Sequence, residues 1–382
     1  MRENLNLSIL SANSSSSKGR RYEEPSSEGR TNFQRDRDRI LHSSAFRRLM
    51  HKTQVFINHE GDLFRTRLTH SLEVSQIART CARRLNLNED LTEALCLSHD
   101  LGHTPFGHAG QFALNRSMRK VDSASNGFEH NIQSLRIVDF LEHKYANFDG
   151  LNLSFETREG ILKRCSKNAA KKLGDVAQRF ISGGNPSLEA QLSNLADEVA
   201  YNHHDLDDGL RAGLLSLDDV LDIPTAMEQA GIVDKLYPSL ERGRRQSEII
   251  RRMISAQVDD LVVTTLGNLE NTNLYSIEDV RTFSKPLVGF SSYMKENVLK
   301  LKKFLHDQMY KHPNVLEMTC VAEEVVENLF FRMLDNSKEH DDAKRIRIIA
   351  DTIAAMTDRH AASLHEKWFP ERASWPSPVG FV

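Results

Sequence analysis

The sequence predicts an all-α fold with at most a small β-hairpin. Glycine and proline, which interrupt helices, are scarce: the 382 residues contain 19 glycines and 10 prolines, below the average combined share of about 12%. Apolar residues recur in most long segments with the period of a helix. At 39% apolar residues the chain can bury a real core, and its length corresponds to about two or three packed units or one large unit.

The expected elements follow in order along the chain. Residues 1–34 hold Ser-rich and charged stretches and are expected to form a flexible tail. Leu41, Ala45 and Leu49 recur every four residues and predict an amphipathic helix that starts at Arg35. Residues 53–64 break this period and predict a short hairpin. Further helices are expected over 68–85, 90–101, 186–206 (with Gly209 after its end), 248–265, 291–310, 319–334 and 343–367, before an irregular, proline-rich end.

Charge, hydropathy and cysteine usage exclude several classes of protein. The net charge of -3 excludes a globally basic nucleic-acid coat, although not a local basic groove. No run of about 18 apolar residues is present, so no membrane span is expected, and no secretory signal is visible. The cysteines show no CxxC spacing and are expected to be free thiols in a reducing cytoplasm: Cys81, Cys96, Cys165 and Cys320.

Histidines concentrate in one part of the chain and point to a metal site. Eight of the 16 histidines fall within residues 42–130, and the stretch 99–108 alone contains three histidines and a carboxylate. His99 and Asp100 end an apolar helix, and His70 on the preceding helix could supply one more metal ligand. Common phosphate-binding and hydrolase motifs such as Walker A, GxGxxG, GxSxG and HExxH are absent. Any phosphate chemistry must therefore use a different set of binding and catalytic residues.

Asp197 is the fourth candidate ligand. Its neighbours Leu195, Ala196 and Val199 are apolar, so a carboxylate held there needs a partner, and a metal ion is a good one. Two neutral imidazoles and two carboxylates would balance the charge of a divalent ion. This mixed set of nitrogen and oxygen ligands suits Mn, Fe, Co, Ni or Zn and is less suited to Mg. The spacing of Asp197, Tyr201 and Asp205 places them roughly along one helix face, whereas Asp207 and Asp208 are expected to be solvated.

With these residues in place, the chain resembles the deoxyguanosinetriphosphate triphosphohydrolase-like branch of the HD-domain phosphohydrolases. His70, His99-Asp100 and Asp197 match the H…HD…D signature. The supporting stretches run in order over nearly the whole folded chain: Phe46–Leu49 with Lys52–Val55, Arg65–Val74, Asp100–His108, Gly127–Asn131, Gly150–Leu153, Ala196–Tyr201 and Met356–Arg359.

The resemblance implies an HD-domain helical fold with an HD core over 35–230 and an added C-terminal helical region over 231–382, which completes the substrate pocket and the oligomer contacts. It implies hydrolysis of dGTP or another dNTP to a deoxynucleoside and inorganic triphosphate. Its metal ligands would be His70, His99, Asp100 and Asp197. Its substrate-binding residues would be Gln54, Val55, Arg67, Tyr201 and Asp205, with Val55 crowding a ribose 2′-hydroxyl. His103, His108 and His130 would surround the α-phosphate as catalytic residues.

The chemistry of the reaction agrees with these roles. Attack on the α-phosphorus needs an activated water, which a divalent ion supplies, and donors around the developing charge, here Arg67 and the histidines. His108 is favoured for protonating the leaving 5′-oxygen. Two positions distinguish this chain within the superfamily. Gln111 stands where several members carry Glu, which puts the proton-transfer arrangement in doubt. Glu198 places the chain in the bacterial branch of the superfamily.

Three basic clusters are expected to be solvated surface or, alternatively, a triphosphate clamp, a dNTP effector pocket or a single-stranded DNA groove. The second is favoured as clamp or effector site, and the resemblance implies a homo-oligomer, dimer-based or hexameric. The clusters are Lys163, Arg164, Lys167, Lys171 and Lys172; Arg242, Arg244, Arg245, Arg251 and Arg252; and Lys295, Lys300, Lys302 and Lys303.

Two alternative functions remain open at this point. The first is another HD-domain phosphohydrolase, a 5′-nucleotidase or a phosphodiesterase, which would release different products. The second is a dNTP- or single-stranded-DNA-binding regulator with weakened catalysis, for which Gln111 is the hint.

Overall fold

A computed structural model describes residues 9–55, 64–371 and 375. This part of the chain is built from helices, and its only β-pairing consists of three isolated bridges, which join Arg20 to Ser154, Thr53 to Thr66 and His143 to Gly150. The predicted all-α fold is therefore confirmed. The predicted hairpin over 53–64 lies mostly on residues 56–63, outside the described residues. None of the described helices is long and apolar enough to span a membrane.

The first part of the chain surrounds the candidate site with short and medium helices. Its helices are α1 (Asn32–Leu41), α2 (Ser44–Arg48), α3 (Arg67–Arg84), α4 (Glu89–Ser98), α5 (Gly107–Val121), α6 (His130–Arg136), α7 (Phe155–Ile161), α8 (Lys167–Leu173) and α9 (Arg179–Ser182). Single turns η2 (Ser14–Ser16), η3 (Leu49–His51), η4 (Ile137–Leu141) and η5 (Asp175–Ala177) connect or extend them.

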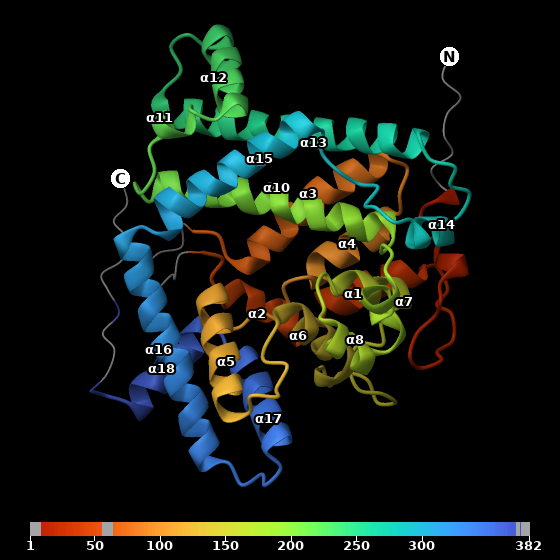
Figure 1. Cartoon of the computed structure of the whole chain (residues 1–382), viewed down its shortest axis with the longest axis vertical. Helices are drawn as coiled ribbons and strands as arrows, with labels where there is room; N and C mark the ends of the chain where they lie inside the picture. Colours follow the sequence, from red (N-terminus) through yellow and green to blue (C-terminus); the bar gives the residue numbers. More distant parts are fainter. Residues whose placement is uncertain (1–8, 56–63, 372–374, 376–382) are drawn as a thin grey trace.

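Longer helices form the rest of the fold. They are α10 (Leu188–Arg211), α11 (Leu217–Val220), α12 (Pro224–Leu236), α13 (Arg242–Glu270), α14 (Ile277–Thr282), α15 (Ser292–Leu305) with the π-helical turn η6 (His306–Tyr310), α16 (Pro313–Asn336), α17 (Asp342–Ala354) and α18 (Asp358–Trp368). Figure 1 shows α13 and α10 running side by side across one end of the molecule, while α16, α5 and α17 descend together at the other.

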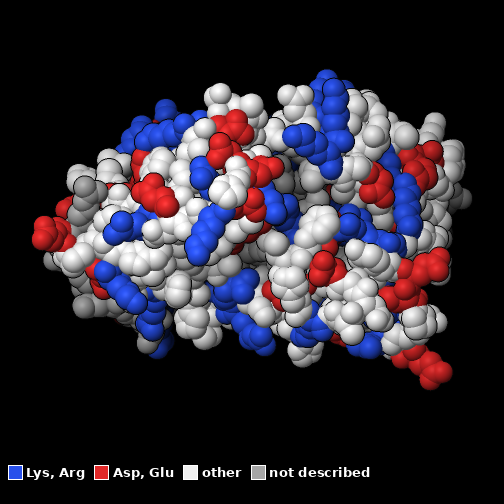
Figure 2. All heavy atoms as spheres, turned by 90° about the horizontal axis from the view of Figure 1, so that it is seen from below, with Lys and Arg blue, Asp and Glu red and all other residues white. Residues whose placement is uncertain are grey.

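Helix α3 is central because it packs between α4 and α10. Its residues Val74, Ala78 and Cys81 face Leu192 and Val199 of α10 in one buried cluster. Each fully buried aliphatic side chain contributes roughly 1.5–3 kcal/mol to folding. The largest hydrophobic cluster joins α5, α12, α13, α16, α17 and α18, and it spans the predicted boundary at residue 230. The face drawn in Figure 2 carries its basic side chains in several groups with acidic ones between them.

Three predicted helices have different bounds in the structure. The helix expected from Arg35 ends at Leu41, because Ser43 begins α2 by accepting a hydrogen bond from the Phe46 N–H. The helix expected over 343–367 is likewise two helices, since the Thr357 side chain caps α18. Gly209 does not follow α10 but lies inside it, where a Cβ would come within 2.6 Å of the Leu215 side chain.

The expected flexible tail over 1–34 differs from what the structure shows for residues 9–34. Leu10 and Ala12 are buried. The carboxylate of Glu189 accepts hydrogen bonds from the Ser11 hydroxyl at 2.7 Å and the Ala12 N–H at 3.0 Å. The Arg20 guanidinium lies 2.6 Å from the fully buried Asp36. Buried carboxylates of the core, which need partners, therefore hold this polar segment in place.

A second set of buried polar contacts ties the C-terminal helices to the turn between α4 and α5. The Asp358 carboxylate accepts hydrogen bonds from the Thr53 N–H at 2.9 Å and the Phe106 N–H at 3.0 Å. The Lys52 ammonium donates to the carbonyls of His103 and Ala354. Phe106 has a left-handed φ of 61°, which costs about 1–2 kcal/mol for a non-glycine residue, so Asp358 stabilises a strained turn.

Replacing Asp358 with Ala should leave two buried N–H groups without an acceptor. We expect the free energy of unfolding to fall by about 2–4 kcal/mol and the melting temperature to fall by roughly 3–5 °C, measured by circular dichroism. Asp335→Ala, at an exposed carboxylate in the last turn of α16, is the control. Equal melting temperatures for the two variants would contradict this role of Asp358.

Candidate functional site

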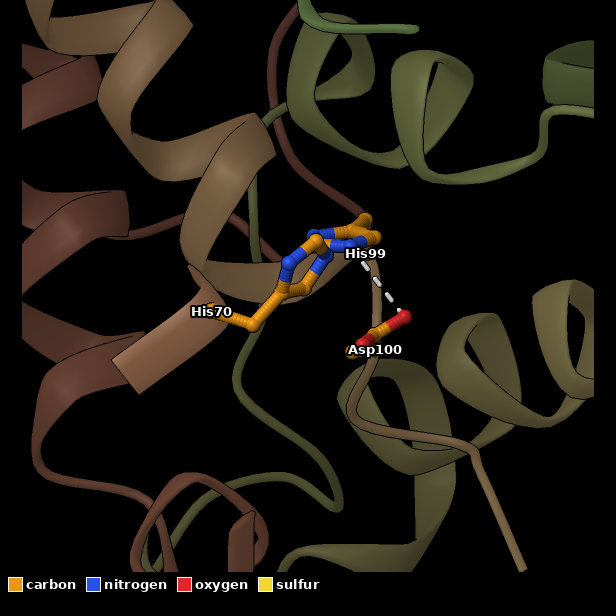
Figure 3. A group of neighbouring side chains, drawn as sticks. All are labelled: His70, His99 and Asp100. Atoms are coloured by element: carbon orange, nitrogen blue, oxygen red, sulfur yellow. Dashed lines mark ion pairs between the residues drawn. The ribbon is translucent and has the colours of Figure 1, made fainter. Parts of the chain in front are cut away.

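Four side chains from three helices converge at the candidate site. His70 comes from α3, His99 and Asp100 from the end of α4, and Asp197 from α10. Metal-ligating atoms of His70, His99 and Asp100 all lie within 4.8 Å of one another, and Figure 3 shows these three side chains pointing together. One oxygen of Asp197, Oδ1, lies 3.0 Å from His70 Nε2 and 3.4 Å from His99 Nε2.

The arrangement fits a divalent cation. His99 Nδ1 contacts the Cys96 carbonyl at 2.6 Å and must carry the proton there, which leaves a lone pair on Nε2. That Nε2 is buried and, although it lies 3.1 Å from Asp100 Oδ1, it has no hydrogen-bond partner among the described residues. A buried basic nitrogen that faces two carboxylates without a hydrogen bond suits a metal ion, and the mixed N/O set suits Mn, Fe, Co, Ni or Zn.

A chain of contacts behind His70 fixes which of its nitrogens faces the site. His204 Nε2 lies 2.7 Å from a carboxylate oxygen of Glu73. His204 Nδ1 lies 3.1 Å from His70 Nδ1. Burial outweighs Glu73 and lowers the pKa of His204, so its ring is neutral with its proton toward Glu73. His204 Nδ1 then accepts the Nδ1 proton of His70, and His70 Nε2 keeps its lone pair toward the site.

The acidic residues after His204 support the same series of contacts behind His70, through Arg65. The prediction that Asp207 and Asp208 are solvated is wrong, because both are buried. The Arg65 guanidinium lies 2.9 Å from Asp207 and 2.7 Å from Asp208, and its Nε lies 3.0 Å from Glu73. Burial raises the pKa of Glu73, whereas its contacts with His204 and Arg65 lower it. The contacts prevail, and the pKa of Glu73 is lowered to about 2.

Cations compensate the two candidate carboxylate ligands. Arg67 Nη1 lies 2.7 Å from Asp100 Oδ2, and Lys163 Nζ lies 2.6 Å from Asp197 Oδ2. Burial alone would raise the pKa of both carboxyl groups. The neighbouring cations and imidazoles outweigh burial and hold the pKa of Asp100 and of Asp197 well below the usual range. Both carboxylates are therefore ionised, as metal ligands must be.

These residues open into a pocket of about 450 Å³. Its walls combine the candidate ligands with basic and aromatic side chains. It is lined by Gln54, Arg67, His70, Asp100, His103, His108, His130, Lys163, Arg164, Asn194, Asp197, Glu198, Tyr201 and Lys302. Lys163 and Arg164 from the first basic cluster and Lys302 from the third line this pocket, and Lys302 lies 2.7 Å from the Glu198 carboxylate. With Arg67 they make four cationic side chains against the three carboxylates of Asp100, Asp197 and Glu198.

The second basic cluster, favoured above as the clamp, does not line this pocket. Arg245 instead pairs with Asp234 at 2.6 Å, and Arg251 and Arg252 pair with Glu248. Members of a basic cluster that lie on one long helix, here α13, point around its axis, so closeness in sequence did not indicate which cluster would reach the site.

The three predicted catalytic histidines lie together. The rings of His103 and His130 stack with centroids 4.0 Å apart, and the His108 ring lies 5.7 Å from that of His103. Burial, followed by Arg67 and His130, lowers the pKa of His108 to about 4, and the same causes hold the pKa of His103 well below its usual range. Both rings are therefore neutral hydrogen-bond donors at neutral pH.

Gln111 contacts His130 and not His108. Its side-chain oxygen lies 2.7 Å from His130 Nδ1 and also accepts the His130 backbone N–H at 3.2 Å. An amide oxygen can only accept, so His130 carries a proton on Nδ1. Gln111 thus orients the His130 ring as a carboxylate would, although without its negative charge.

The predicted sugar-binding residues are brought near one another only in part. Gln54 and Tyr201 line the pocket, and Gln54 Oε1 is buried with no hydrogen-bond partner among the described residues. Val55 packs against the largest hydrophobic cluster, and neither Val55 nor Asp205 lines the pocket. Asp205 is instead joined to Tyr201 through Tyr310, whose hydroxyl donates to the Asp205 carboxyl and lies 2.8 Å from the Tyr201 hydroxyl.

Tyr310 and the pair His204–Glu73 are site residues that the sequence analysis did not assign a role, whereas Lys302 was named there as a member of the third basic cluster. His204 had a signal, because it lies seven residues after Asp197 and so returns to the same face of α10. Tyr310 had none, since it sits in the π-helical turn η6 and reaches the site only through the tertiary packing of α15.

Comparisons with known proteins agree with this geometry. An HD domain model matches residues 67–222, and a phosphohydrolase-associated domain model matches residues 288–367. A protein of Bordetella pertussis named deoxyguanosinetriphosphate triphosphohydrolase-like protein is 53% identical over 370 residues, which cover 95% of this chain and 96% of the relative. Proteins of the same name from Ralstonia nicotianae and Nitrosomonas europaea are 52% and 50% identical, each over 95% of this chain and over 94% and 98% of their own lengths.

A solved structure of a hypothetical protein from Aquifex aeolicus is a more distant match. It is 16% identical with a TM-score of 0.37, over 88% of this chain and 71% of its own. HD domains bind divalent metal ions, and the His70, His99 and Asp100 cluster could hold one.

The contacts behind His70 predict a loss of metal affinity when they are removed. Replacing His204 with Ala or Glu73 with Gln should weaken Mn²⁺ binding by about 10–100-fold, because His70 loses the partner that fixes its proton on Nδ1. Equilibrium dialysis with metal analysis measures this. His306→Ala, at a histidine on the surface of η6, is the control. Unchanged affinity in both test variants would contradict the assignment.

Asp205 predicts a pH-dependent stability difference. Burial, with a smaller contribution from Asp208, raises the pKa of Asp205 to about 8. The folded state therefore keeps a proton that the unfolded state releases near pH 4, and this group makes the protein less stable as the pH rises from about 4 to 8. Asn cannot ionise, so the melting temperature of Asp205→Asn relative to the unmodified protein should rise by roughly 1–2 °C per pH unit in that range. A difference in melting temperature between the two proteins that does not change with pH would refute the raised pKa of Asp205.

Proposed function

Because this chain belongs to the deoxyguanosinetriphosphate triphosphohydrolase-like family of HD-domain proteins, we propose that it hydrolyses deoxynucleoside triphosphates at the α-phosphate and releases a deoxynucleoside and inorganic triphosphate. Its family makes it a phosphohydrolase, and the proposal concerns the substrate and the bond that is cleaved.

One observation supports the proposal most: four cationic side chains share the pocket with the candidate metal ligands. Arg67, the adjacent Lys163 and Arg164, and Lys302 come from three separate segments, and all line the same 450 Å³ space. Three carboxylates of the pocket offset part of this charge, because Asp100 pairs with Arg67, Asp197 with Lys163 and Glu198 with Lys302. A bound divalent ion would leave the pocket with a clear excess of positive charge, which suits the roughly four negative charges of a triphosphate better than the two of a monophosphate. The size of the pocket also suits a nucleotide rather than an isolated phosphate.

His70, His99, Asp100 and Asp197 would hold the divalent ion. When bound, such an ion acts as a Lewis acid that activates water near neutral pH and neutralises charge on phosphate oxygens. Arg67 would be positioned for phosphate, because it lines the pocket while its Nη1 is held by Asp100. Gly107 allows this placement, since a Cβ there would lie 2.9 Å from Arg67 Nη2.

The stacked His103 and His130 rings and the nearby His108 would donate hydrogen bonds around the α-phosphate. His108 is the candidate for giving a proton to the leaving 5′-oxygen. Its pKa of about 4 belongs to the pocket without nucleotide, where burial and, after it, Arg67 oppose its protonation. A polyphosphate beside Arg67 is multiply anionic and would raise the pKa of His108 toward the range in which it can act as a general acid.

The sugar would lie against Gln54 and Tyr201. Gln54 Oε1 has no hydrogen-bond partner among the described residues and would accept a hydrogen bond from a hydroxyl group. The Tyr201–Tyr310–Asp205 cluster adds polar groups from η6. The exclusion of ribose by Val55, a homo-oligomeric assembly, a dNTP effector and a single-stranded DNA partner stay predictions from the family resemblance.

The reaction is tested by incubating the full chain with each dNTP, singly and mixed, in the presence of Mg²⁺, Mn²⁺ or Co²⁺. Ion-exchange chromatography should show deoxynucleoside and triphosphate in equal amounts. His99→Ala should lower the rate at least about a hundredfold, because the metal cradle loses a ligand. Lys302→Gln should instead raise KM mainly, since Lys302 lies at the rim of the pocket.

Other products would redirect the assignment. Orthophosphate released from a nucleoside monophosphate, with no triphosphate from any dNTP, would identify a 5′-nucleotidase. No turnover with any metal, together with dNTP binding, would identify a regulator with weakened catalysis.

A further inference from the structure

Three of the ion pairs between a carboxylate and a lysine or arginine have both partners in the wall of the candidate active-site pocket. In two of them the carboxylate is a candidate metal ligand, Asp100 or Asp197. In the third, Lys302 Nζ lies 2.7 Å from Glu198 Oε1. Glu198 follows Asp197 on α10, whereas Lys302 comes from α15, which runs beside α10 in Figure 1. The third pair therefore joins two helices at the pocket without belonging to the metal site.

The Glu198–Lys302 pair is also the most accessible of the three. The side chains of Lys302 and Glu198 are 43% and 29% exposed, whereas those of Arg67 and Asp100 are 2% and 4% exposed. Ion pairs between partly exposed groups are weak, because water screens them and the side chains lose freedom when they pair. An anionic ligand in the pocket can therefore separate Lys302 from Glu198 far more easily than it can separate the two buried partners.

Glu198 has no second cation to turn to. Within the described parts of the chain, Lys302 is the only ion-pair partner of Glu198, and Glu198 is the only ion-pair partner of Lys302. When a ligand takes Lys302, the Glu198 carboxylate stays in the wall of the same pocket without compensation. Like charges there repel each other more strongly than in bulk water, because the protein around them is less polarisable. Glu198 thus opposes an anionic ligand both before and after Lys302 changes partner.

Helix α15 does not depend on this ion pair for its position. Leu301 and Leu305 are each 1% exposed and anchor α15 in the core. In η6, which follows α15, the Tyr310 hydroxyl lies 2.8 Å from the hydroxyl of Tyr201 on α10. The helix therefore stays docked when the pair opens, and the change is confined to the two side chains.

We propose that Glu198 sets the affinity of the pocket for the phosphate chain of its substrate, by holding Lys302 before the ligand binds and repelling the ligand afterwards. This inference rests on the proposed function, because it takes a triphosphate as the ligand. A chain with about four negative charges attracts the Lys302 ammonium more strongly than one carboxylate does.

The remaining repulsion limits the affinity for the substrate and favours release of the triphosphate product. A group that weakens substrate and transition state alike changes KM and leaves the chemical step unaffected. Glu198 is therefore a residue that tunes binding and not a catalytic residue.

The test is calorimetric titration of the full-length protein with magnesium tripolyphosphate, which measures binding without turnover. The binding event that Lys302→Gln weakens is the one compared. Glu198→Gln should bind tripolyphosphate about three- to tenfold more tightly than the unmodified protein, because the lysine is released and the repulsion is removed. Glu198→Ala, which also removes the charge, should show the same gain.

Glu296→Gln is the matched control for Glu198→Gln. Glu296 is an exposed carboxylate on α15, it pairs with Lys300 at 2.8 Å, and it lies outside the pocket wall. Its variant should bind tripolyphosphate as the unmodified protein does. A gain in the control as large as that in Glu198→Gln would overturn the proposal, since it would reflect net charge alone.

A double-mutant cycle separates the release of Lys302 from general repulsion. In a Lys302→Gln background, the gain caused by Glu198→Gln should be less than half as many fold, because no lysine remains to be released. An equal gain in both backgrounds would overturn the proposal, as would equal or weaker binding by Glu198→Gln and Glu198→Ala.

Turnover separates this inference from the proposed reaction. In Glu198→Gln, the KM of the hydrolysed dNTP and the inhibition constant of triphosphate should fall by similar factors. Tighter tripolyphosphate binding by Glu198→Gln, with no triphosphate released from any dNTP, would refute the reaction and support this inference. Triphosphate release by the unmodified protein, with no gain in tripolyphosphate binding by Glu198→Gln, would overturn this inference alone.

Discussion

The structure depends on one electrostatic constraint: two imidazoles and two carboxylates must share a small, largely buried volume at the meeting point of α3, α4 and α10. Burial of such groups is costly unless each has a partner. The helices that bring the ligands also bring the partners. Arg67 and Glu73 flank His70 at three-residue steps along α3, and His204 follows Asp197 by two helical turns on α10. Spacing of three to four residues keeps them on one face.

The same constraint explains why the C-terminal helices belong to the site although they supply few of its ligands. The turn between Asp100 and His108 contains a strained residue, Phe106, whose buried N–H donates to Asp358, some 250 residues later in the chain. The Lys52 ammonium joins the His103 carbonyl of the same turn to the Ala354 carbonyl. The loop that carries two of the candidate catalytic histidines is therefore held in place by the distant helices α17 and α18, and α15 contributes Lys302 and, through η6, Tyr310 in the same way.

Much of this could be predicted from the sequence, and the parts that could not share a physical cause. Helical periodicity indicated α3, α10 and α13 because each has a continuous apolar face. The coincidence of His70, His99, Asp100 and Asp197 followed from motif spacing, and the structure does bring them together, while their roles stay predictions. Ser43 and Thr357 were missed as helix starts because the helical spacing of apolar residues continues past each of them. The capping hydrogen bond that begins a new helix there leaves no mark on that spacing. Lys163, Tyr310 and the burial of Asp207 depend on contacts across more than thirty residues, which local patterns do not encode.

The docking of residues 9–34 has a consequence for how the chain is made. Ser17 is bonded to Glu156, and Ser11 to Glu189, 139 and 178 residues further along. At about 5–20 residues per second, a ribosome needs roughly 10–35 s to supply those acceptors. This segment is thus synthesised well before the residues that hold it in place. Its serine-rich, charged composition, which keeps it soluble without a partner, suits a segment that must wait outside the ribosome before the core exists.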